Sequence, residues 1–116
     1  MEDLTTITFR SKIFDYEKGE DWKYLGDKPA IIDCFTYWCS PCKLLVPILE
    51  ELEKEYGDRI NFYKINTESE SELSALFKVR SIPTMLFIPM NGQPQVSNGL
   101  IPKASIEKVM KDVFDI

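Results

Sequence analysis

The sequence predicts an α/β domain in which a central mixed sheet of roughly four to five strands is flanked by helices on both faces. An apolar run at 30–36 is typical of a strand buried on both sides. An amphipathic helix follows directly at 41–56, and Asn91-Gly92 is a hairpin signal further along the chain. With 116 residues, the chain is expected to form a single domain, 1–116, around one core.

Composition narrows the function classes before any motif is considered. The formal net charge of -5, from 14 basic and 19 acidic residues, argues against nucleic-acid binding, which depends on clustered positive charge. No stretch approaches the roughly 18 consecutive apolar residues of a membrane span, and residues 1–13 lack a signal-peptide layout. The sequence contains no histidine, which excludes Cys-His nucleophiles and His-ligated metal sites. We therefore expect chemistry from thiols, carboxylates, lysines and tyrosines.

The N-terminal half is predicted from periodicity. A strand is expected at 6–9 and a helix at 18–25. In the run at 30–36 both faces of the alternation are apolar and Asp33 is the one charged residue, which predicts a central strand with Asp33 buried. Apolar residues then recur at spacings of three and four over 41–56, which predicts an amphipathic helix closed by a glycine.

A second strand and a short helix are predicted next. Aromatic and β-branched residues alternate over 60–66, which favours a strand beside the first. Ser69 followed by Glu72 matches a capping box and predicts the start of a helix. The acidic residues at 68–72 are then most simply interpreted as a solvated helix start.

The C-terminal part completes the sheet. A third strand is predicted at 84–88, and the hairpin signal leads to an antiparallel return strand at 95–97. An apolar stripe predicts a terminal helix at 103–114. The resulting order, βαβαββα, predicts a mixed sheet with helices on both faces, because right-handed crossovers between parallel strands leave few alternatives.

The candidate chemistry lies at the start of the first long helix. Cys39 and Cys42 are separated by two residues there, so that an exposed Cys39 can bond to a Cys42 one turn inward. The helix dipole favours the Cys39 thiolate as the attacking group, and Cys42 would resolve the mixed disulfide. A structural zinc site needs four ligands, whereas the chain offers three cysteines and no histidine. The third, Cys34, is expected in the core on the sheet face opposite Asp33.

These residues resemble a known family. Residues 32–43, Ile-Asp-Cys-Phe-Thr-Tyr-Trp-Cys-Ser-Pro-Cys-Lys, are similar to the strand and Trp-Cys-Gly-Pro-Cys-Lys signature of the thioredoxin family, with serine in place of glycine. The resemblance covers most of the chain from 30 to 114. It implies the thioredoxin fold and a protein-disulfide reductase that needs no organic cofactor and no metal. Further matches fall where the family places its lysine, its Ile-cisPro-Thr, its hairpin and its late glycine: Lys64, Ile82-Pro83-Thr84, Asn91-Gly92 and Gly99.

The resemblance also implies roles for single residues. Asp33 is similar to the proton acceptor for Cys42, with Lys64 as its partner, and Pro83 to the cis-proline beside the dithiol. Without the resemblance, Lys64 would be a solvent-facing strand residue and Pro83 an ordinary proline at the start of a strand. The implied substrate-binding surface consists of Trp38, Ser40, Pro41, Ile82, Gly99 and Leu100.

Two alternatives stay open at this stage. One is an exported thiol-disulfide exchange protein with an oxidising or isomerising role, and the other is a binding module that uses a surface of Trp38, Ile82 and Leu100. The complete dithiol argues against pure binding, since docking would not need both cysteines. The expected partners of the monomer are disulfide-bonded proteins and a reductase or other electron donor, with no nucleic acid and no membrane insertion. The expected compartment is the cytoplasm, or the periplasm or exterior if a signal peptide has been removed.

Overall fold

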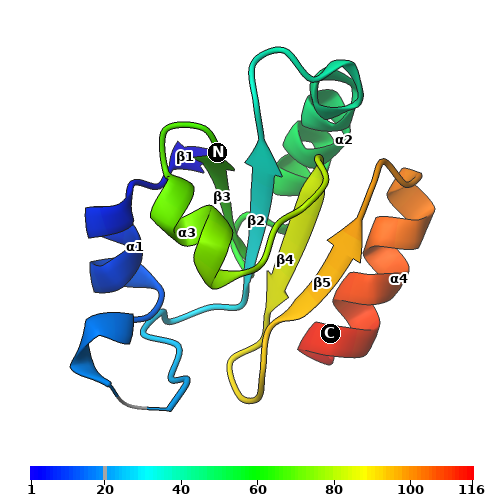
Figure 1. Ribbon diagram of the computed structural model, residues 1–116. Helices are drawn as coiled ribbons and strands as arrows, with labels where there is room; N and C mark the ends of the chain where they lie inside the picture. The colour runs from blue at the N-terminus through cyan, green and yellow to red at the C-terminus, as the bar shows by residue number, and fades with distance from the viewer. Residues whose placement is uncertain (20) are drawn as a thin grey trace.

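A computed structural model describes residues 1–19 and 21–116 and contains a mixed five-stranded sheet with strand order β1-β3-β2-β4-β5 (Figure 1). Strands β1, β3 and β2 run parallel, whereas β4 is antiparallel to β2, and β5 to β4. The predicted fold class is confirmed. In sheet order the strands are β1 (Glu2–Asp3), β3 (Asn61–Asn66), β2 (Ala30–Phe35), β4 (Thr84–Ile88) and β5 (Gln95–Asn98).

Helices cover both faces of the sheet (Figure 1). Helices α2 (Ser40–Tyr56) and α4 (Lys103–Phe114) pack against one face through an apolar cluster that includes Leu45 and Met110. Helices α1 (Thr6–Lys12) and α3 (Ser71–Leu76) pack against the other face through a second cluster. The sheet lies between the two clusters, and β2 is its central strand. All six residues of β2 are buried, as the apolar run predicted. Among the described residues, no helix is long and apolar enough to cross a membrane.

The N-terminal predictions are wrong. The predicted strand at 6–9 is helix α1, because Thr5 and Thr8 form a capping box and place Phe9 in the core. The alternation of Thr and apolar residues that suggested a strand arises by chance, since Ile7 is 77% exposed. The predicted helix at 18–25 is also absent from the described residues: a short 3-10 helix, Tyr16–Lys18, ends at Gly19, whose φ is +67°. Residue 20 of that prediction lies outside the described residues.

The remaining elements lie within a few residues of their predicted bounds, but the expected cap of α3 is wrong. The N-cap residue is Glu70, which makes no capping side-chain hydrogen bond. The Ser69 hydroxyl donates instead to the backbone oxygen of Asn66 at 3.3 Å. The acidic residues at 68–72 do more than start a solvated helix, because the Glu70 carboxylate accepts a hydrogen bond from the backbone N–H of Thr6 at 2.9 Å. This contact joins the α3 cap to the start of α1.

Candidate active site

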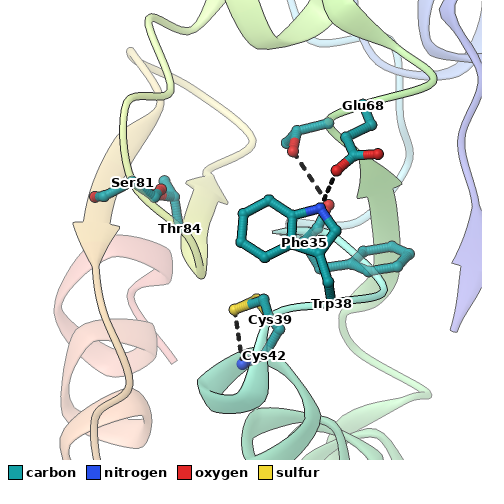
Figure 2. Close-up of a disulfide and its surroundings, with 8 residues drawn as sticks. Phe35, Trp38, Cys39, Cys42, Glu68, Ser81 and Thr84 are labelled. Atoms are coloured by element: carbon teal, nitrogen blue, oxygen red, sulfur yellow. Dashed lines mark hydrogen bonds between the residues drawn. A yellow bond between two sulfur atoms is a disulfide. The ribbon is translucent and has the colours of Figure 1, made fainter.

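The two cysteines lie where strand β2 leads into helix α2. Cys39 is the N-cap residue of the helix, and Cys42 is in its first turn. They form a disulfide with Cα atoms 5.3 Å apart, and the backbone N–H of Cys42 donates to Cys39 Sγ at 3.2 Å (Figure 2). A thiolate at Cys39 would therefore accept a hydrogen bond from the Cys42 N–H and lie at the positive end of the helix dipole.

The disulfide is largely buried. Cys39 is 5% exposed and Cys42 2%, and both pack in a small cluster with Phe35 and the half-buried Ile82. The sequence predicted that Cys39 is exposed. In the disulfide-bonded protein it is buried instead, because the linked sulfur atoms lie within this cluster.

Asp33 lies on strand β2, the strand that leads to the disulfide, and is 1% exposed. Neither of its carboxylate oxygens has a hydrogen-bond partner among the described residues. A cavity of about 150 Å³ is lined by Asp33, Cys42, Lys43 and Lys64, among others, and so joins the carboxylate to the second cysteine. Burial raises the pKa of Asp33 to about 7, and the Lys64 ammonium lowers it by a smaller amount. The carboxyl can therefore both hold and release a proton near neutral pH.

Lys64 is in register with Asp33 on the neighbouring strand β3. Its ammonium forms an ion pair with Asp3 on β1, with an Nζ–Oδ2 distance of 3.8 Å. Among the described residues no ion pair joins Lys64 to Asp33, so the direct partnership implied by the resemblance is not formed here. Nothing in the sequence of β1 had indicated a role for Asp3.

The segment before strand β4 lies across from the disulfide (Figure 2). The Ile82–Pro83 peptide bond is cis, and the Pro83 carbonyl accepts the N–H of Gly99 at 2.8 Å. Gly99 has a φ of +90°, a conformation that favours glycine. The Thr84 hydroxyl donates to the Ser81 carbonyl at 2.6 Å. These contacts bring Ile82, Pro83 and Gly99 together, although 16 residues separate the first and last of them in the chain.

The rest of the implied substrate surface is exposed. Trp38 is 69% exposed and Leu100 40%, and Ser40 and Pro41 are also exposed at the start of α2. The Trp38 indole Nε1 donates to the Glu68 carboxylate, which fixes one edge of the ring (Figure 2). Glu68 follows β3 and was missed from the sequence, because only the folded chain brings it to Trp38.

Cys34 points to the sheet face opposite Asp33, where it packs in the cluster beneath α1 and α3. Burial raises the pKa of its thiol to about 12, with a smaller contribution from Asp33. A thiol held in this way is a poor nucleophile. No group of three or more potential metal-ligating side chains occurs in the part of the chain that the structure describes.

We expect Cys34 in the reduced, folded protein to react with iodoacetamide at pH 7.5 at least about a hundredfold more slowly than Cys34 in the protein unfolded by urea. The reason is its burial and its raised pKa. Mass spectrometry of peptides after timed alkylation measures both rates. Equal rates in the folded and unfolded protein would contradict the interpretation of Cys34 as an unreactive core residue.

Comparison with known proteins was consistent with this site. The sequence profile of the family described as Thioredoxin matches residues 8–112. A thioredoxin of Borreliella burgdorferi is 46% identical over 96% of this chain and 95% of its own length. A chloroplastic M-type thioredoxin of Pisum sativum is 38% identical over 74% of this chain and 51% of its own length. Among solved structures, a chloroplastic thioredoxin z has a TM-score of 0.81 at 24% identity, and the match covers 97% of this chain and 93% of that one.

Proposed function

Because the chain belongs to the thioredoxin family and is a thiol-disulfide oxidoreductase that reduces disulfides in other proteins, we propose that Cys39 is its attacking thiol and Cys42 its resolving thiol. The observation that carries this assignment is the Cys42 N–H hydrogen bond to Cys39 Sγ at the N-terminus of α2. This arrangement favours negative charge on Cys39. Cys42 lies within the first turn and is more deeply buried.

The proposed reaction has two exchange steps. The Cys39 thiolate attacks one sulfur of a substrate disulfide, forms a mixed disulfide and releases the other substrate sulfur as a thiolate, which takes a proton. Cys42 then loses its proton and attacks Cys39 Sγ, which releases the second substrate thiol and forms the Cys39–Cys42 disulfide. We propose that Asp33 accepts the Cys42 proton; the cavity that both residues line and the raised pKa of Asp33 support this role near neutral pH.

The substrate is proposed to bind beside the disulfide as an extended segment. The exposed Trp38 and Leu100 and the half-buried Ile82 offer an apolar surface, which supports contact with unfolded or loop segments of other proteins. Pro83 and Gly99 shape the edge of this surface through their backbone contact. Ser40 and Pro41 complete it at the exposed start of α2.

Each turnover leaves the pair oxidised, so we propose that a separate reductase or other electron donor restores the dithiol. One chain supplies all of these groups, which supports a monomer as the working unit. A reducing function fits the cytoplasm better than an oxidising compartment, where the donor would have to be delivered separately.

The direction of electron flow is tested by the reduction potential of the Cys39–Cys42 pair, measured by equilibration with a thiol-disulfide buffer and counting of free thiols. A Cys34→Ala variant serves as the control, because it leaves only the two active-site thiols. We expect a reversible two-electron couple near or below about -230 mV, as for reducing family members. A value near about -120 mV would instead indicate an oxidising role, and the absence of a reversible couple would indicate a binding module.

Ser40 replaces the glycine of the family signature, and it is expected to make the pair more oxidising. Its hydroxyl can donate a hydrogen bond to the thiolate and so stabilise the reduced state. A hydrogen bond of about 1 kcal/mol corresponds to about 20 mV for this two-electron couple, so Ser40→Gly should lower the potential by about that amount. The same equilibration measures it, and an unchanged or higher potential in Ser40→Gly would contradict the hypothesis.

A further inference from the structure

Three charged side chains form a row across neighbouring strands of the sheet. Asp3 on β1 is in register with Lys64 on β3, and Lys64 is in register with Asp33 on β2. The three strands lie side by side (Figure 1). Residues in register on parallel strands project from the same face, and the strands are about 4.8 Å apart. One ammonium group therefore lies between two carboxylates.

Among the described residues, the Lys64 ammonium lies within ion-pair distance of Asp3 but not of Asp33. Lys64 Nζ is 3.8 Å from Asp3 Oδ2, whereas neither oxygen of Asp33 has a hydrogen-bond partner among the described residues. The Asp3 side chain is 64% exposed and that of Lys64 34%, so the ion pair lies at the solvent end of the row. Asp33, at the other end, is buried. The cation is thus drawn outward, away from the carboxylate that faces Cys42.

Strand β1 is held in place by contacts that do not involve the Asp3 side chain. The Leu4 N–H donates to the Lys64 carbonyl at 2.8 Å, and the Leu4 side chain is buried. The terminal ammonium of Met1 pairs with Glu53 at 3.2 Å. Removing the Asp3 charge should therefore leave the strand and the Lys64 backbone where they are.

We propose that Asp3 is a positioning residue that holds the Lys64 ammonium away from Asp33 and so keeps the buried carboxyl free of a salt bridge and able to carry a proton. The inference rests on the proposed function, in which Asp33 takes the Cys42 proton. Without Asp3, Lys64 pairs with Asp33 and favours its charged form, which makes the carboxyl a weaker proton acceptor.

Other groups near Asp33 stay the same when Asp3 is changed. Cys42 and Lys43 from α2, and Tyr37 from the preceding loop, line the same cavity. The residue of β4 in register with Asp33 is the apolar Met85. An effect of Asp3 on the carboxyl must therefore pass through Lys64 or act directly through space, and these two routes can be separated.

The experiment is a carbon-13 NMR titration of the Asp33 carboxyl in the disulfide-bonded protein. We expect Asp3→Asn to lower the titration midpoint by about half a pH unit, the size that an exposed ion pair supports. The matched control is Glu2→Gln, which removes a charge from the neighbouring position of β1, where Glu2 pairs with Lys12, and it should leave the midpoint unchanged. In a Lys64→Met background, the effect of Asp3→Asn should disappear.

Three results would overturn the inference: no shift in Asp3→Asn, an equal shift in Glu2→Gln, or a shift that persists in Lys64→Met. The rate of protein-disulfide reduction against pH provides a second readout, in which the midpoint of Asp3→Asn should move in the same direction as the carboxyl midpoint. The proton role itself is tested separately with Asp33→Asn. If that variant keeps the wild-type pH profile, the proposed role of Asp33 fails, while the NMR titration still decides whether Asp3 controls Lys64.

Discussion

Replacing Cys39 by serine is expected to lower the rate of protein-disulfide reduction by at least about a thousandfold, because a serine hydroxyl is not ionised at neutral pH and cannot form the mixed disulfide. The rate is measured with a disulfide-bonded protein such as insulin as substrate and dithiothreitol as electron donor, over the background without protein. The matched control is Cys34→Ser, which removes the buried thiol outside the site and should keep most of the activity.

Cys42→Ser should also lower the rate of turnover, but by a smaller factor, because dithiothreitol in the assay can release the mixed disulfide that Cys42 would otherwise resolve. Cys39 can still attack, so in the absence of dithiothreitol the variant should accumulate as a covalent adduct with its substrate, and added dithiothreitol should release it. Mass spectrometry under non-reducing conditions detects the adduct. If Cys39→Ser trapped substrate and Cys42→Ser did not, the assigned roles of the two thiols would be reversed.

The centre of the fold could be predicted from the sequence because its patterns are unambiguous. The run at 30–36 is apolar on both faces, and the long helix that follows has a clear apolar stripe. Both patterns arise because these apolar side chains are buried in the core, and burial of the same side chains stabilises the strand and the helix in the folded chain. The position of Cys39 and Cys42 at a helix N-terminus follows directly from these two elements.

The N-terminal region could not be predicted in the same way. Residues 6–9 alternate as a strand would, but Thr5 and Thr8 cap a helix, and the carboxylate of Glu70 accepts the N–H at its start. That carboxylate comes from a residue more than sixty positions away. A pattern over only four residues does not distinguish a strand from a helix, and the long-range contact that stabilises the helix is not visible in that pattern.

The same reason explains the site residues that were missed. Glu68 meets the Trp38 indole and Asp3 meets Lys64 only after the sheet and its crossovers have formed. Each is one acidic residue among 19 in the sequence, without a motif around it. Family resemblance identified Asp33 and Lys64 but implied that they pair with each other, and the competing role of Asp3 lies outside the residues on which that resemblance rests.

Asp33→Asn should stabilise the folded protein by about 2–3 kcal/mol at pH 8. Burial raises the pKa of this carboxyl from 3.8 to about 7, a shift of about three units, and each unit corresponds to about 1.36 kcal/mol, so about 4 kcal/mol is the upper limit. The expected gain is smaller because the amide is also polar and buried. Urea unfolding of the disulfide-bonded protein measures the difference.

The pH dependence of this gain separates it from an ordinary packing effect. Below about pH 3 Asp33 is protonated in both the folded and the unfolded chain, so its burial carries no charge penalty there. As pH rises towards 7 the unfolded chain ionises first, and the folded wild type loses stability until its own carboxyl ionises. The advantage of Asp33→Asn should therefore be near zero at about pH 3, grow through pH 6 and level off at about pH 8. Asp112→Asn removes the same charge from an exposed position of α4 and should show no such rise. A gain for Asp33→Asn that did not change with pH would contradict the raised pKa. A loss of reductase activity together with the predicted gain would show that the site retains a destabilising carboxyl because the reaction needs it.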